Sequence, residues 1–344
     1  MTQFCSGSCQ SCSSLRMEVE DGAELCFPLL LNTSCRKSTS PWPEAVLRHI
    51  VLSSISLLTV ALNLLVIISI SHFRQLHTPT NILLLSLAVS DFLVGLLLMP
   101  GEILQNTTCW FLGDLMCYLY IYVSFIITST SVGDMVLISV DRYAAICDPL
   151  HYTTRVTERR VKLCVCLCWL CSVFYSSVFV KDDLSQPDRH NSCHGECVIV
   201  IDYTAGTVDL VLIFILPITL IIVLYMRVFV VAVSQARAMR SHITAVTLQR
   251  SVTLTKKSEL KAARTLGVLV VVFLICFCPY YGVSLAGDNL LNSSFAFLLF
   301  YIFYFNSCLN PIIYTLFYPW FRKAVKLVIT LQILQPGSRE ANIL

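Results

Sequence analysis

Seven long apolar blocks, separated by short polar connections, constrain the fold of this chain more than any other feature of its sequence. They cover approximately residues 47–71, 82–105, 115–140, 161–180, 203–233, 264–286 and 294–317. Each block is long enough to cross a bilayer, which takes about 20 residues of helix. Charged residues make up only 13% of the chain, against roughly 25% in soluble domains. We therefore expect an all-α membrane protein, a seven-transmembrane helix bundle.

The charges between the blocks predict how this bundle is oriented. The connections after blocks three and five are rich in lysine and arginine, whereas those on the opposite side carry mostly acids. Basic residues are retained on the cytoplasmic side of a membrane. We expect a multi-pass protein of the plasma membrane, with an extracellular N-terminal tail over 1–46, the bundle over 47–317 and a cytoplasmic end over 318–344. No basic leader with a short apolar core is evident, so we expect the first block to direct insertion.

Two features outside the blocks are informative. The stretch from Tyr318 to Leu327 alternates aromatic and basic residues, which predicts a short amphipathic helix lying on the lipid of the inner leaflet. Asn-x-Ser/Thr glycan acceptors occur at Asn32, Asn106 and Asn292. Asn32 is the best candidate because it is farthest from the membrane.

Several strongly polar residues within the blocks need an explanation, among them Asn63, Asp91, Asp134, Asp209 and Asn310. An aspartate near the centre of a spanning helix costs roughly 3 kcal/mol, so such residues are functional candidates by default. A transporter or proton channel that uses the three aspartates as relay sites is one interpretation. Broken helices in repeated halves, which mark many transporters, are not apparent. For Asp134 we expect a buried, hydrogen-bonded acid that faces neighbouring helices.

Several short motifs resemble those of rhodopsin-class G protein-coupled receptors: Leu87-Ala88-Val89-Ser90-Asp91, Asp141-Arg142-Tyr143, Trp169, Pro217, Cys276-Phe277-Cys278-Pro279 and Asn310-Pro311-Ile312-Ile313-Tyr314. The run from Asn306 to Phe321 further resembles the fingerprint of trace amine-associated receptors. The resemblance implies a receptor for a small cationic amine that activates a stimulatory G protein and raises cyclic AMP, with a leaning toward olfactory neurons. We see no catalytic constellation and expect neither an enzyme nor a nucleic-acid partner.

The expected ligand site departs from the usual pattern of amine receptors. The resemblance implies an aspartate seven residues beyond Cys117, where this chain has Ser124. Asp209, eight residues before Pro217, is the leading substitute counter-ion; the alternative is that it reaches water at the end of its helix. Glu102 is a weaker second anion that serves a diamine or points to solvent. The resemblance implies the remaining cavity wall, for which packing alone is the alternative: Phe125, Thr128, Phe277, Tyr280, Tyr281, Phe300 and Tyr304.

The resemblance also implies a conformational switch at the cytoplasmic side. Arg142, beside Asp141 and Tyr143, would pair with Glu259 and hold helices three and six together at rest. Outward movement of helix six about Pro279 would break this pair and open a cavity for the G protein. Rearrangement of a polar core with Asn310 and Tyr314 would accompany it.

The polar core and the external cysteines complete the expectations from the resemblance. An oxygen-rich pocket for a hydrated sodium ion is implied, with a water-filled network lacking metal as the alternative; its residues are Asp91, Ser131, Asn306, Ser307 and Asn310. No other cofactor is expected. Two disulfides are implied, Cys117 with Cys197 and Cys35 with Cys193. Sequence alone cannot fix connectivity, so Cys35 being free, or paired with Cys5, Cys9, Cys12 or Cys26, remains open.

Overall fold

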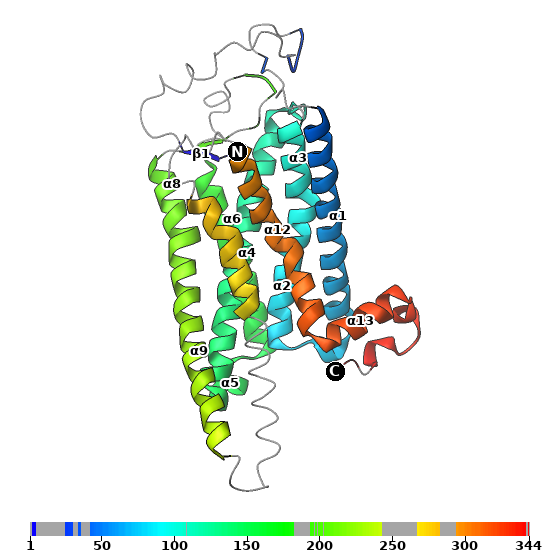
Figure 1. The fold of residues 1–344 in the computed structure, drawn as a ribbon, viewed down its shortest axis with the longest axis vertical. Coiled ribbons are helices and arrows are strands. Elements are labelled where there is room, and N and C mark those ends of the chain that lie inside the picture. Colours follow the sequence, from blue (N-terminus) through cyan, green and yellow to red (C-terminus); the bar gives the residue numbers. More distant parts are fainter. Residues whose placement is uncertain are drawn as a thin grey trace.

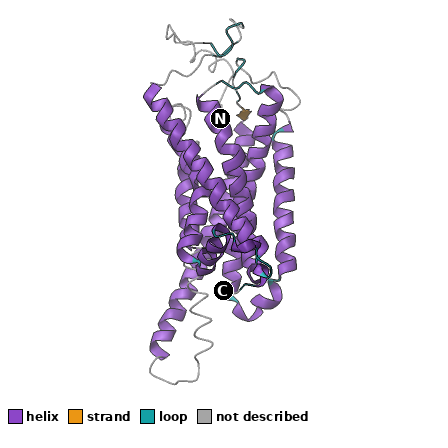
Figure 2. Ribbon diagram, turned by 90° about the vertical axis from the view of Figure 1, so that its right-hand side faces the viewer, coloured by secondary structure: helices purple, strands orange, loops and turns teal. Residues whose placement is uncertain are grey.

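The computed structural model describes residues 2–4, 25–29, 34–35, 42–107, 109–181, 193–195, 197, 199–201, 203–242, 267–282, 294–341 and 343. Its long helices run side by side along the longest axis of the molecule (Figures 1 and 2). The marked N-terminal end lies toward one end of the bundle and the C-terminal end toward the other (Figure 1). The expected all-α helix bundle is therefore confirmed.

The first four spans are formed by α1 (Trp42–His72), a second helix in three parts, α4 (Gly113–Cys147) and α6 (Glu158–Phe179). The second span joins α2 (Pro79–Leu93), a π-helical turn (Val94–Leu98) and α3 (Met99–Thr107). Helix α2 begins where the Thr78 side chain accepts a hydrogen bond from the backbone N–H of Asn81. A threonine in this position satisfies a donor that the helix itself cannot use. Helix α1 begins five residues before the expected boundary at 47.

The fifth span is α8 (Tyr203–Asp209), a π-helical turn (Leu210–Ile215) and α9 (Leu216–His242). The sixth is described over Gly267–Gly282, and the seventh is α12 (Ser294–Phe317), which has the predicted bounds. Among the described residues, five helical stretches satisfy length and hydropathy criteria for crossing a membrane: Val46–His72, Pro79–Gln105, Gly113–Cys147, Glu158–Phe179 and Tyr203–Ser234.

The distribution of side chains is that of a bundle surrounded by lipid. Large apolar residues such as Leu57 and Phe174 are 71% exposed, whereas Asn63, Asp91 and Asp134 are 0% exposed. Lipid tails are as apolar as leucine, so an outward leucine costs nothing in a bilayer. Polar groups in the same region must find partners inside the protein.

The predicted amphipathic helix follows the seventh span. Helix α13 (Pro319–Ile329) buries Trp320, Phe321 and Ala324 and exposes Arg322 and Lys323. One face is therefore apolar and the other cationic, as expected of a helix on an anionic leaflet.

The chain beyond α13 turns back toward α1. Short 3-10 turns at Gln332–Leu334 and Ser338–Glu340 follow the helix. The backbone N–H of Ile343 donates to Oε1 of Gln75 at 3.2 Å, and Ile343 is only 1% exposed. The end of the chain thus packs against the connection between α1 and α2, a contact that the sequence did not predict.

Candidate functional site

Asp209 ends α8 immediately before the π-helical turn of the fifth span. Its side chain is buried, with the residue 8% exposed, and Oδ1 accepts a 2.6 Å hydrogen bond from the hydroxyl of Tyr175 on α6. The alternative that Asp209 reaches water at the end of its helix is wrong. A buried carboxylate needs such donors, and it attracts a cation more strongly than an exposed one.

Two groups of aromatic rings lie near this carboxylate, one that includes Tyr175 and one that includes Tyr281, which interacts electrostatically with Asp209. On the side of α6, the Phe179 ring lies 5.6 Å from that of Tyr175 and 4.8 Å from that of Phe125 on α4. On the side of the sixth span, Tyr281 stacks on Phe214 of the π-helical turn, with ring centroids 4.3 Å apart. The structure therefore brings the predicted Phe125 and Tyr281 into one aromatic region with Asp209.

The predicted wall continues along the sixth and seventh spans. Phe277 is 4% exposed and its ring lies 4.3 Å from that of Phe303 on α12. Phe303 also contacts Tyr280 and Tyr304, at centroid distances of 5.2 and 5.4 Å. The side chain of Phe300, another predicted wall residue, lies outside the described residues.

Ser124 and Thr128 are half-buried on α4. The Ser124 hydroxyl donates to the carbonyl oxygen of Tyr120 at 2.7 Å, one turn earlier in its own helix. This bond uses the only proton of the hydroxyl, so Ser124 offers an ammonium an acceptor without a full charge.

Glu102 on α3 is also buried, at 7% exposed. Its Oε1 accepts hydrogen bonds from the hydroxyls of Tyr120, at 3.2 Å, and Tyr304, at 3.4 Å. The alternative that Glu102 points to solvent is wrong. A Cβ on Gly101 would lie 2.2 Å from Cε2 of Tyr120, so the glycine allows the Tyr120 ring to lie against α3 and reach Glu102.

Three disulfides hold the N-terminal tail and the connections at the same end of the bundle. Cys117 is bonded to Cys197 and Cys35 to Cys193, as predicted. A third bond joins Cys26 of the N-terminal tail to Cys109, which was not anticipated. The open alternatives for Cys35 are therefore wrong, and Cys26 has a different partner.

These disulfides are part of a compact backbone cluster. The N–H of Cys26 donates to the carbonyl of Cys35, and the N–H of Trp110 to the carbonyl of Gly195, at 2.8 and 2.9 Å. Gly195 has φ +107°, and a Cβ there would lie 3.0 Å from that of Cys26. Only glycine adopts this backbone readily, so the tail, Cys109 and the Cys193–Cys197 region are packed together.

Hydrogen bonds of the polar core join the first, second and seventh spans. The Asn310 amide donates to Oδ2 of Asp91 at 2.7 Å, and the Asn63 amide donates to the carbonyl of Ser307 at 3.0 Å. Ser131 and Ser307 are each 4% exposed. Among the described residues, several buried oxygens of this core have no hydrogen-bond partner: Oδ1 of Asn63, Asp91, Asn306 and Asn310, and the hydroxyl of Tyr314. Hard oxygen donors of this kind fit a hydrated alkali cation, and orphaned oxygens are costly without water or an ion.

Asp134 is 0% exposed, and its Oδ2 accepts a 2.9 Å hydrogen bond from Ser86. The Ser86 hydroxyl in turn accepts from Nε1 of Trp169 at 3.0 Å. Asp134 thus links α4 to α2 and α6, and the prediction of a buried, hydrogen-bonded acid between helices is confirmed.

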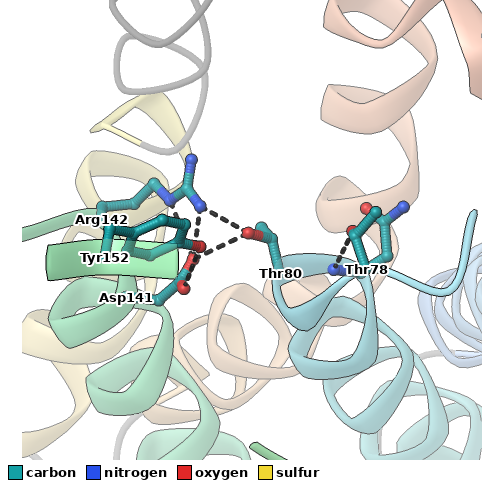
Figure 3. A network of polar contacts seen from close by, with 6 residues as sticks. Thr78, Thr80, Asp141, Arg142 and Tyr152 are labelled. Carbon is teal, nitrogen blue, oxygen red and sulfur yellow. Dashed lines mark hydrogen bonds and ion pairs between the residues drawn. The ribbon is translucent and has the colours of Figure 1, made fainter. Parts of the chain in front are cut away.

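The C-terminal end of α4 carries a four-residue polar network (Figure 3). Arg142 bonds to Asp141 through Nε, at 3.0 Å, and through Nη2, which also donates to Thr80. The Thr80 hydroxyl donates to Oδ2 of Asp141 at 2.9 Å, and the hydroxyl of Tyr152, on α5 (Pro149–Arg155), donates to Oδ1 at 2.8 Å. Arg142 and Asp141 are each 4% exposed. The network therefore ties α4 to α2 and to the following connection.

Tyr152 keeps its proton in this network. Burial and the neighbouring carboxylate of Asp141 raise the pKa of Tyr152 to about 12. At neutral pH the phenol is a hydrogen-bond donor to a carboxylate that already holds Arg142.

The structure leaves some predicted residues untested. Glu259, the proposed partner of Arg142, and Asn32 lie outside the described residues. Tyr143 is 37% exposed at the end of α4, and Pro279 lies in the described part of the sixth span.

Sequence reasoning missed several residues that the structure brings to these sites. Tyr175 and Phe179 lie in an apolar block where tyrosine and phenylalanine suggest packing, and no motif singles them out. Thr80 lies in the first turn of α2 and Tyr152 on α5, and only the fold places them beside Asp141.

Comparison with known proteins places this arrangement in a family. The family model of the 7 transmembrane receptor (rhodopsin family) matches residues 62–314. Trace amine-associated receptor 13c of Danio rerio is 38% identical over 339 residues, which cover 94% of this chain and 97% of that protein. Trace amine-associated receptor 5 of Rattus norvegicus is 38% identical, with 94% and 96% covered, and trace amine-associated receptor 4 of Mus musculus is 32% identical, with 93% and 95% covered. The chain is similar to these receptors over nearly its whole length, and it belongs to the rhodopsin family of seven-transmembrane receptors and, within it, to the trace amine-associated receptors.

Proposed function

We propose that this multi-pass receptor binds small cationic amines through Asp209 and signals through a stimulatory G protein that raises cyclic AMP. The receptor class and an amine ligand follow from the family, which is not a class of enzymes. Family membership also removes the transporter and channel interpretation. The residue roles, the G protein class and the cell type are our proposal.

The buried carboxylate of Asp209 is the observation that carries this proposal. It lies beside Tyr175 and the aromatic region of Phe125 and Tyr281, and Ser124 supplies no charge across the bundle. An ammonium 4 Å from a carboxylate gains on the order of 4 kcal/mol at an effective dielectric of 20, before desolvation is subtracted. Aromatic ring faces add an attraction for the cation of about 0.5–2 kcal/mol.

The conformational step starts at the cytoplasmic network. Arg142 is held by Asp141 and Thr80, and we propose that it also pairs with Glu259 in the resting state. Amine binding favours a state in which the sixth span moves outward about Pro279 and these contacts change. A ligand shifts such an equilibrium only by its difference in affinity for the two states.

The polar core offers a second control of the same equilibrium. Asp91, Ser131, Asn306, Ser307 and Asn310 would hold a hydrated sodium ion, whose charge would balance the carboxylate of Asp91. Closing of this core on activation, with Asn310 and Tyr314 rearranged, would expel the ion. The orphaned oxygens of the core support this role.

We propose that the receptor lies in the plasma membrane with the N-terminus outside, as the basic connections after the third and fifth spans predict, and with a glycan on Asn32. The resemblance to trace amine-associated receptors adds olfactory neurons as the proposed cell type. The disulfide cluster of Cys26, Cys35 and Cys193 supports the external position, since disulfides persist in oxidising surroundings.

A cyclic AMP reporter assay with a panel of volatile mono-, di- and polyamines tests the proposed coupling. The parent receptor, matched for surface expression with an Arg142→Ala variant, is expected to raise cyclic AMP with at least one amine, and the variant is not. Amine responses that proceed only through another second messenger would show that the stimulatory class is wrong. Silence toward every amine, with the receptor at the surface, would contradict amine recognition itself.

A further inference from the structure

We propose that the chain beyond α13 forms a clasp on the connection between α1 and α2, and that this clasp restrains signalling by holding the start of α2 in its resting position. The clasp comprises residues 332–341 and 343. Its restraining role rests on the proposed resting state of the polar network around Arg142. Three features carry it: an ordered turn, a buried anchor, and hydrogen bonds that lead from the anchor to Thr80.

The clasp is ordered by its own sequence. Gln335-Pro336-Gly337-Ser338 forms a β-turn, in which the N–H of Ser338 donates to the carbonyl of Gln335 at 3.2 Å and Gly337 has φ +82°. Proline followed by a glycine with positive φ is typical of a type II turn. The Ser338 hydroxyl then donates to the carbonyl of Ile333 at 2.7 Å. Because the segment is folded on itself, its docking costs less conformational entropy than the docking of a free chain.

Ile343 is the anchor of the clasp. It is 1% exposed and belongs to the same buried apolar cluster as Phe73 and Leu76, which lie in the connection between α1 and α2. Its backbone N–H donates to Oε1 of Gln75 in the same connection. Burial of a large apolar side chain is favourable. Leu334 of the same clasp is 77% exposed, so the clasp docks through a selected side chain.

A polar contact joins the clasp to the last turn of α1. The Ser338 hydroxyl uses its one proton on the carbonyl of Ile333, so it accepts the 3.0 Å hydrogen bond from Nε2 of His72. Arg74 and Glu340 approach to 3.7 Å, but both side chains are exposed and such a pair contributes little. The clasp therefore contacts the end of α1 as well as the connection that follows it (Figure 1).

Hydrogen bonds lead from this connection to the network around Arg142. The Asn81 amide donates to the carbonyl of Leu76 at 2.9 Å and ties the connection to the first turn of α2. Thr80, in the same turn, donates to Asp141 and accepts from Arg142 (Figure 3). A clasp that fixes the connection also fixes this turn. Release of the clasp frees the turn, and the resting state loses a support that the signalling state does not share.

Amide hydrogen exchange on the purified receptor tests the docking. Ile343→Asn removes the apolar anchor, and Leu334→Asn is the matched control at an exposed leucine of the same clasp. Gly337→Ala strains the turn without a clash, because a Cβ there meets no atom within 4 Å. We expect residues 337–343 of the parent and of Leu334→Asn to exchange at least about tenfold more slowly than those of Ile343→Asn and Gly337→Ala.

Nucleotide exchange on a panel of purified G proteins, the stimulatory class included, tests the restraint. Ile343→Asn and Gly337→Ala should raise ligand-independent activation at least about twofold at equal receptor concentration, and Leu334→Asn should stay at the parent level. The double variant of Ile343→Asn with Thr80→Val should activate no more than Thr80→Val alone, because both changes act on the same turn of α2.

The two measurements separate the outcomes. Exchange of residues 337–343 that is as fast in the parent as in Ile343→Asn overturns the clasp. Slow exchange that Ile343→Asn accelerates, with ligand-independent activation unchanged, overturns the restraint and leaves a purely structural contact. If Ile343→Asn does not fold, Gly337→Ala decides both measurements.

Failure of the proposed function gives a different result. A parent that activates only a G protein of another class contradicts the stimulatory coupling, and the variants still test the restraint on that class. If the parent and all variants activate no G protein, the proposed function and the restraint fail together, whatever the exchange rates.

Discussion

The hydroxyl of Tyr175 donates a 2.6 Å hydrogen bond to Oδ1 of Asp209, which joins the fourth and fifth spans at the proposed ligand site. A hydrogen bond to a charged group contributes about 1.5–3 kcal/mol. The bond orients the carboxylate, and it also compensates for the water that the carboxylate has lost. The same carboxylate therefore serves packing between helices and the proposed recognition of an ammonium.

Tyr175→Phe removes this donor and leaves the ring in place. We expect the ligand-free receptor to unfold several degrees lower than the parent, because the buried carboxylate loses its partner. A saturating amine should recover part of the difference, since its ammonium replaces the lost donor. Thermal unfolding with and without amine measures this, and Tyr122→Phe, at a more exposed hydroxyl that contacts Ser177, is the control. An equal loss with and without amine would show that Asp209 is not where the ammonium binds.

The disulfide between Cys26 and Cys109 gives a prediction about the tail. Cys26→Ser and Cys109→Ser should lower surface expression or amine response to a similar extent, and the double variant should be no worse than either. The same relation is expected of Cys35 and Cys193. Surface staining and dose–response curves of singles and doubles provide the test. Additive losses within either pair would mean that its members act separately.

Sodium should oppose amine binding if the polar core holds it. We expect the parent receptor to bind amines several-fold more weakly in sodium chloride than in the chloride salt of a large organic cation at equal ionic strength. Asp91→Asn should remove this difference, because it keeps the shape of the side chain and removes its charge. Binding measured at matched salt makes the comparison. Identical affinities of the parent in both salts would favour a water-filled network without metal.

Glu259→Ala is expected to raise ligand-independent cyclic AMP by releasing Arg142. The effect should be modest, because Arg142 is also held by Asp141 and Thr80. Thr80→Val removes a hydrogen-bond donor to Asp141. The double variant of Thr80→Val with Glu259→Ala should therefore raise basal signalling further than Glu259→Ala alone. Reporter assays at equal surface expression provide the measurement, and basal signalling that stays at the parent level in Glu259→Ala would exclude a restraining role.

Much of the fold was predictable because lipid allows few solutions. A chain in a bilayer must satisfy its backbone within helices, so seven apolar blocks lead directly to seven spans, and α12 has the predicted bounds. The π-helical turns at Val94–Leu98 and Leu210–Ile215 were not predictable, because an apolar block looks the same whether one turn holds an extra residue or not. Such a turn rotates all later residues by about 100°. The positions of Glu102 and Phe214 follow from these turns.

The residues of the candidate site likewise fall into those that the sequence identified and those that it did not. Asp209 was identified from the sequence because a charge in a spanning helix is rare and Ser124 leaves the usual position empty of charge. Tyr175 and Phe179 were not identified, because an aromatic residue in an apolar block carries no sign of what it faces. The Cys26–Cys109 bond was not identified either, since only the folded tail brings these cysteines together.

The account depends above all on Asp209 being the counter-ion of the bound ammonium. Asp209→Asn keeps the shape of the side chain and removes the charge. Amine binding to this variant, at parent-level surface expression, is the most direct measurement, together with the double variant Ser124→Asp with Asp209→Asn.

We predict that Asp209→Asn lowers affinity at least tenfold, about 1.4 kcal/mol or more, and that the double variant partly restores binding or changes which amines bind. Unchanged amine affinity in Asp209→Asn, with binding abolished in Glu102→Gln instead, would contradict the account and place recognition on the second span.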